Sequence, residues 1–169
     1  YGEYRMEPTA ALTDKGFTGH AMNDDLGLVF MRARFFVVGM GRFASPEITE
    51  CSGLVVSRKN PGVLWAHNDS GDSARLFAVK EDGSLRGIYH LARADSRDWE
   101  DLALGPCRDP GKECLYVGDI GDNTRHRRKI QVYRVEEPTV PLDGPPVRRK
   151  LEGTERFDCT YPDGPHDAE

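Results

Sequence analysis

The stretch Leu115–Asn123, LYVGDIGDN, is a short apolar run that leads directly into an acidic, glycine-rich loop. A weaker copy of this stretch, LWAHNDSGD, occupies Leu64–Asp72. The two D-x-G-D loops begin at Asp69 and Asp119, which are fifty positions apart. A period of this length, made of short strands and turns, is typical of a β-propeller blade or a related β repeat. The pair therefore predicts a repeat of short strands in the chain beyond about residue 47.

Around these loops each repeat unit is predicted to contain about four short strands. Glu50 opens the first unit and Glu100 opens the second. The alternating apolar runs Leu76–Val79 and Ile130–Val135 follow the two loops and are expected to be strands. A hairpin turn is expected at Glu81–Ser84, EDGS, because Asp-Gly favours tight two-residue turns. The predicted fold is all-β, a partial propeller of about two blades over residues 47–169.

Residues 136–160 are rich in proline and charge, and we expect them to connect two blades. Within this connection Val147–Leu151, VRRKL, is predicted to be an edge strand that carries polar side chains. No helix longer than a turn or two is expected anywhere in the chain. Trp65 and Trp99 are expected to pack in the core between blades, with stacking on a ligand as the alternative.

Residues 1–46 have a different character. The apolar and aromatic run Leu28–Phe36 carries Arg32 and Arg34 at alternate positions, a pattern that favours a strand over a helix. Frequent glycines divide the segment into short β pieces with tight turns. FTGHAMNDDLGLVFMRARFF, followed by GMGRFASPE, resembles the C-terminal end of the Rhs/YD-repeat core. This resemblance implies a fragment of a β-rich shell without an active site of its own.

The second segment also carries a resemblance. ECSGLVVSRKNPGVLWAHNDSGD, DWEDLALGP, LYVGDIGDN and YPDGPHDAE are similar to stretches of bacterial phytase-like β-propellers. The resemblance implies a six-bladed ring with acidic loops around a central channel, calcium in that channel and, in some members, phosphoester hydrolysis. Because this chain holds about two blades, we expect an incomplete propeller, with further blades or an Rhs shell as partners.

Several carboxylates that converge repel one another, and a bound cation is the simplest way to keep them ionised. The sequence offers oxygen ligands and no His/Cys cluster at zinc spacing, which favours Ca²⁺ or Mg²⁺. The residues predicted to bind Ca²⁺ are Glu50, Asp69, Asp72, Glu100, Asp101, Asp119 and Asp122. The wider acidic set adds Asp98, Asp163, Asp167 and Glu169. The alternative is structural, because Asp and Gly at strand ends also form tight turns and Asx caps.

Phosphoester hydrolysis would also require cations that clamp the phosphate and a group that transfers a proton. The candidates for such contacts are His67, Arg75, Arg97, Arg125 and His166. For each histidine the alternative is a structural hydrogen bond to a loop carbonyl. The chain has no G-x-S-x-G motif, no P-loop and no Cys–His arrangement, which excludes the common serine-hydrolase and nucleotide-binding classes. We therefore favour a non-catalytic β scaffold with Ca²⁺-binding loops, and a metal-dependent phosphoester hydrolase in a completed ring is the alternative.

The net charge of −5 argues against a nucleic-acid partner. The one dense basic run, Arg125–Lys129, is predicted to be a solvated loop or edge. No apolar stretch approaches the length of a membrane span, and residues 1–20 lack the apolar core of a signal peptide. Cys107 and Cys114 flank a DPGK turn and could form a disulfide across a hairpin, with free thiols as the alternative. A disulfide would agree with an extracellular or cell-envelope location.

Overall fold

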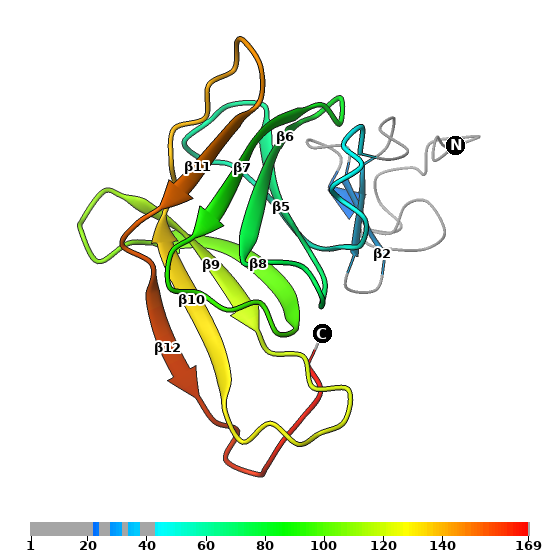
Figure 1. The fold of residues 1–169 in the computed structure, drawn as a ribbon, viewed down its shortest axis with the longest axis vertical. Helices are drawn as coiled ribbons and strands as arrows, with labels where there is room; N and C mark the ends of the chain where they lie inside the picture. Colours follow the sequence, from blue (N-terminus) through cyan, green and yellow to red (C-terminus); the bar gives the residue numbers. More distant parts are fainter. Residues whose placement is uncertain (1–21, 24–27, 32–33, 38–42, 169) are drawn as a thin grey trace, which may run out of the picture.

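The structure, a computed structural model, describes residues 22–23, 28–31, 34–37 and 43–168. All regular elements of these residues are β-strands, and none of them is a helix (Figure 1). The prediction of an all-β fold is thereby confirmed for the part of the chain that the structure describes.

The first sheet is an antiparallel meander with one additional strand. It consists of β4 (Cys51–Val56), β5 (Val63–Asn68), β6 (Arg75–Lys80) and β7 (Leu85–Leu91), each paired with the next. The fifth strand, β11 (Val147–Leu151), joins the outer edge of β7 in parallel orientation. The edge strand predicted in the proline-rich connection is therefore present, and it belongs to the sheet of the first repeat unit.

The second sheet repeats the meander. It contains β8 (Trp99–Pro106), β9 (Glu113–Asp119), β10 (Ile130–Glu136) and β12 (Glu155–Cys159), in the spatial order β12-β10-β9-β8. The chain leaves this sheet after β10, forms β11 on the first sheet and then returns as β12 (Figure 1). The third and fourth strands of the second unit are therefore separated by an excursion that ties the two sheets together.

The N-terminal strands form a small sheet of their own. β1 (Met22–Asn23), β2 (Leu28–Met31) and β3 (Arg34–Val37) pair in sequence order, and β3 lies beside β4. The run predicted to be a strand, Leu28–Phe36, thus holds two antiparallel strands. Most of the residues that carry the Rhs/YD-repeat resemblance lie outside the described residues.

The two large sheets share one apolar core. Trp65 and Tyr89 of the first sheet lie in the same buried cluster as Trp99, Val117 and Tyr133 of the second sheet. Trp65 meets Tyr89 edge to face, with ring centroids 5.1 Å apart. Because successive side chains of a strand point to opposite faces, the sheets pack through alternate residues of their strands. Both tryptophans therefore lie in the core between the sheets, as predicted.

The other face of the first sheet is also buried. Leu64, Phe77 and Ile88 form a second cluster, against which Phe43 and Ile48 pack. All six residues of β5 are buried, because this strand lies inside the sheet and is covered on both faces. The first sheet is thus the rigid support for the loop that follows β5.

Candidate functional site

Three carboxylates meet where the two sheets adjoin. Asp69 follows β5, Asp98 directly precedes β8, and Glu100 belongs to β8. One oxygen from each of the three lies within 4.8 Å of the others. The cluster, called here the acidic triad, can hold a metal ion. It brings together two predicted ligands, Asp69 and Glu100, with one residue of the wider acidic set.

Asp98 is the most constrained member of the triad. Its backbone N–H donates to Asp119 Oδ1 at 3.0 Å, and its carbonyl accepts from the N–H of Gly121 at 3.2 Å. The residue is only 9 % exposed, and its Oδ1 has no hydrogen-bond partner among the described residues. Burial raises the pKa of the Asp98 carboxyl, and the nearby charge of Asp69 raises it further. A buried carboxylate oxygen with these surroundings favours a cation.

The second D-x-G-D loop closes over the acidic triad. A Cβ atom at Gly121 would lie 2.5 Å from Asp98 Oδ2 and 2.6 Å from Glu100 Oε1, so a larger residue here would force these two carboxylates to shift. Asn123 Nδ2 donates to Asp98 Oδ2 at 3.5 Å, and Ser52 Oγ donates to Glu100 Oε2 at 3.2 Å. The loop therefore shapes the triad through its backbone and its glycine.

The two aspartates of this loop lie outside the triad. Asp119 is 1 % exposed and forms an ion pair with Arg127 at 2.8 Å. Asp122 Oδ2 accepts from the backbone N–H of Arg127 at 2.5 Å, and the N–H of Asp122 donates to Asp167 Oδ1 at 2.9 Å. The structure thus places both predicted ligands against Arg127, where their carboxylates hold the loop in shape.

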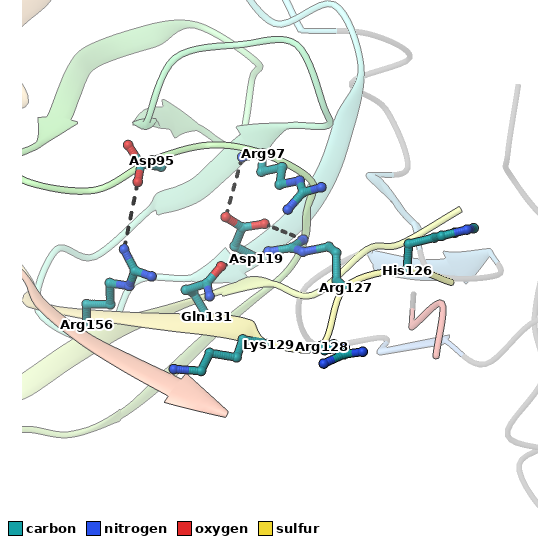
Figure 2. A pocket seen from close by; sticks show the side chains of 9 residues that line it. All are labelled: Asp95, Arg97, Asp119, His126, Arg127, Arg128, Lys129, Gln131 and Arg156. Carbon is teal, nitrogen blue, oxygen red and sulfur yellow. Dashed lines mark hydrogen bonds and ion pairs between the residues drawn. The ribbon is translucent and has the colours of Figure 1, made fainter. Parts of the chain in front are cut away.

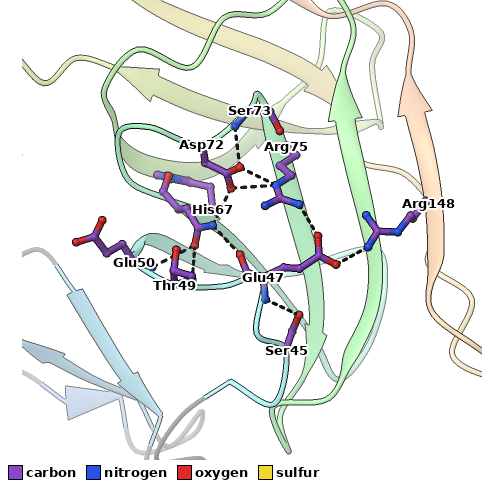
Figure 3. Close-up of polar contacts among 10 residues, drawn as sticks. Ser45, Glu47, Thr49, Glu50, His67, Asp72, Ser73, Arg75 and Arg148 are labelled. Carbon is purple, nitrogen blue, oxygen red and sulfur yellow. Dashed lines mark hydrogen bonds and ion pairs between the residues drawn. The ribbon is translucent and has the colours of Figure 1, made fainter.

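Asp72, in the first D-x-G-D loop, belongs to a separate polar network (Figure 3). Its carboxylate accepts from Arg75 Nε at 2.9 Å and from Asn68 Nδ2 at 2.7 Å. Arg75 also donates to Glu47 at 2.6 Å, and Glu47 pairs in addition with Arg148 of β11. The hydrogen bond from Arg148 is the largest cause of the lowered pKa of Glu47. Arg75, a candidate phosphate contact, is therefore paired with two carboxylates.

The remaining predicted ligands are more exposed. Glu50 lies on the surface before β4, and Figure 3 shows it pointing away from the Asp72 network. Asp101 is exposed on β8, and its Oδ1 accepts from the N–H of Leu102 at 2.8 Å. Glu169 lies outside the described residues. The structure brings neither Glu50 nor Asp101 into the triad.

The two candidate histidines have different environments. His67 is fully buried, and its ring meets Trp99 edge to face at a centroid distance of 5.5 Å. Its Nδ1 donates to the carbonyl of Asn68 at 2.8 Å, and burial lowers its pKa. A Cβ at Gly53 would lie 2.1 Å from His67 Nε2, so the ring fills the space above this glycine. His166 is exposed and lies 2.9 Å from Asp163.

The basic run Arg125–Lys129 does more than form a solvated edge. Arg127 is buried, whereas the residues on either side of it are exposed. Four residues of the run, 126–129, line a pocket of about 570 Å³ together with Arg97 and Arg156 (Figure 2). Arg125 itself is exposed, has a positive φ of 54° and is not among the residues that line this pocket.

Two further features stabilise the ends of the strands opposite the triad. Glu137 is completely buried, and its carboxylate accepts from Trp65 Nε1 at 2.9 Å, from Asn60 Nδ2 at 3.2 Å and from Ser57 Oγ. Nothing in its sequence context, a charged run before proline, indicates this burial. Cys107 and Cys114 form a disulfide that closes the turn between β8 and β9.

Comparison with protein-family models, curated proteins and solved structures finds no match to this chain. Among the described residues there is no helix with the length and apolar character needed to span a membrane.

Proposed function

We propose that this chain is a non-catalytic β scaffold, two blades of a phytase-like propeller attached to an Rhs-like segment, in which the acidic triad binds Ca²⁺. Two antiparallel meanders that pack face to face, with β4 beside β8, support the propeller assignment. The Cys107–Cys114 disulfide supports an extracellular or cell-envelope location.

The observation that carries the proposal is the buried, unpartnered Oδ1 of Asp98 beside two other carboxylates. Ca²⁺ binds oxygen ligands at about 2.3–2.6 Å, so two ligands on opposite sides of the ion are about 5 Å apart. A mutual separation within 4.8 Å suits such an ion. Water molecules would complete the six to eight oxygens that Ca²⁺ prefers.

The proposal is tested by titrating CaCl₂ into the full chain after chelating resin has removed bound metal. We expect saturable heat in calorimetry and a rise in melting temperature, since Ca²⁺ binds the folded state alone. Asp98→Asn should weaken Ca²⁺ binding by about tenfold or more, because it removes a charged ligand. Asp143→Asn, at an exposed carboxylate far along the chain, is the matched control. Absence of Ca²⁺ binding, or unchanged affinity in Asp98→Asn, would refute the cation site.

The same variant has a pH signature in metal-free protein. The pKa of Asp98 is raised in the folded state, so protonation stabilises the fold at acid pH. That contribution is lost as the pH rises through the raised pKa, and the ionised carboxylate then destabilises the fold. Asp98→Asn should therefore melt higher than the parent protein at neutral pH, by an amount that shrinks as the pH falls.

Catalysis by the same cluster is the alternative, and one assay separates it from a scaffold. The full chain is incubated with p-nitrophenyl phosphate, with Ca²⁺ added and with Ca²⁺ removed. Turnover that requires Ca²⁺ and disappears in folded Asp98→Asn would replace the scaffold proposal with a metal-dependent phosphoester hydrolase.

A further inference from the structure

We propose that the pocket at the end of the second sheet is a binding site for a small multivalent oxyanion. Its cationic walls come from three separate parts of the chain (Figure 2). Arg97 precedes β8, Arg128 and Lys129 precede β10, and Arg156 belongs to β12. A volume of about 570 Å³ accommodates a small molecule rather than a single ion.

The charge of the pocket is opposite to that of the molecule. Five Arg and Lys side chains and two Asp side chains line it, a net charge of 5 − 2 = +3, whereas the whole chain has a net charge of −5. Asp158 on β12 offsets part of this excess, since it lies 3.7 Å from Lys129 and 2.8 Å from Arg156. Asp95 lies 3.9 Å from Arg156. Among the described residues, the side chains of Arg97 and Arg128 form no ion pair. With Asp158 also counted, the lining keeps a net charge of 5 − 3 = +2. Asp98 and Asp122 act on Arg127 as well, but neither of them lines the pocket.

The floor of the pocket is rigid. Arg127 donates to Asp119 at 2.8 Å, to the carbonyl of Gly121 at 2.7 Å and to Gln131 Oε1 at 2.8 Å. These contacts fix the backbone just before Arg128 and Lys129, whose side chains remain exposed beside the cavity. Because the backbone is already fixed, binding of an anion requires the ordering of side chains but not of the loop itself.

The ligand class follows from the donors. A guanidinium group presents planar pairs of N–H donors that match two oxygens of a phosphate or carboxylate. Several such groups around one cavity fit a ligand with more than one anionic group. None of the three triad carboxylates lines the pocket, so a bound anion would not occupy the cation site.

The inference is tested in metal-free protein by calorimetric titration with inorganic tripolyphosphate and, separately, with citrate at matched ionic strength. We expect saturable binding of at least one of them, and the tighter one distinguishes phosphate from carboxylate ligands. Arg97→Ala and Arg128→Ala should each weaken that binding about tenfold, the usual effect of losing one charge-assisted contact. Arg149→Ala, which removes an exposed arginine from β11, is the matched control and should bind as the parent protein does.

Two results would overturn the oxyanion site. One is the absence of saturable heat with both anions. The other is an equal loss of affinity in the pocket variants and in Arg149→Ala, which would mean attraction to the general surface charge. Because the protein is metal-free, failure of the Ca²⁺ proposal leaves this test unaffected.

Discussion

Arg127 holds the second D-x-G-D loop in its conformation. It is 5 % exposed, and its guanidinium donates to a carboxylate, a backbone carbonyl and a side-chain amide. Its backbone N–H also donates to Asp122. The charge of Arg127 balances that of Asp119, which is buried beside it and would otherwise face the interior unpaired.

Replacement of Arg127 should therefore lower the free energy of unfolding. Arg127→Ala leaves Asp119 buried without its cation, a change that typically destabilises a fold by about 3–5 kcal/mol. Urea denaturation followed by circular dichroism would measure this loss of unfolding free energy. Arg128→Ala removes an exposed arginine next to it and should change stability by less than about 0.5 kcal/mol. Equal stability of the two variants would contradict the structural role assigned to the buried pair.

At the scale of elements, the connection between β10 and β11 fastens the second sheet to the first. Glu137, just after β10, receives donors from the turn between β4 and β5 and from Trp65. Lys59 Nζ donates to the carbonyl of Glu137 at 2.8 Å, and the N–H of Val140 donates to Asn60 Oδ1 at 2.8 Å. The chain can then continue as β11 along β7.

Glu137 and its neighbour Glu136 provide a matched pair of variants. Glu137→Ala removes the acceptor of Trp65 Nε1, of Ser57 Oγ and of the Lys59 N–H. The unfolding free energy should fall by about 3 kcal/mol, because each buried donor left unpaired costs about 1 kcal/mol or more. Glu136→Ala removes exposed ion pairs with Lys112 and Lys59 and should cost less than about 1 kcal/mol. Thermal denaturation of both variants measures the two losses of stability. A smaller loss for Glu137→Ala than for Glu136→Ala would show that the connection does not fasten the second sheet to the first.

The sequence predicts the strands of this fold better than the contacts between them. The fifty-residue offset predicted two similar units because it records strands and turns, which are local features. It also predicted Val147–Leu151 as an edge strand. It could not assign that strand to the first sheet, because pairing with β7 depends on a path through space. Asp119 and Asp69 occupy equivalent positions in the repeat, yet only Asp69 is in the triad, since Arg127 has no counterpart in the first loop.

At the scale of the molecule, the two sheets are joined by more than the connection. The buried cluster between them contains large side chains of both, including Trp65 and Tyr89 from one and Trp99 and Tyr133 from the other. Neither sheet can expose its inner face without opening this cluster. The acidic triad also draws residues from both sheets, so its geometry depends on the same packing.

The two tryptophans test whether the sheets fold as one unit, because each reports on one sheet. Trp65 lies in β5, and Trp99 begins β8. In Trp99→Phe the fluorescence of Trp65 should follow the same urea transition as the far-ultraviolet circular dichroism, and the same should hold for Trp99 in Trp65→Phe. Coincident transitions are expected because the shared core makes partial unfolding expose apolar surface on both sheets. If the Trp99 signal were lost at a clearly lower urea concentration than the circular dichroism, the second sheet would unfold by itself. The acidic triad would then be lost in that intermediate, and Ca²⁺ should raise only the earlier of the two midpoints.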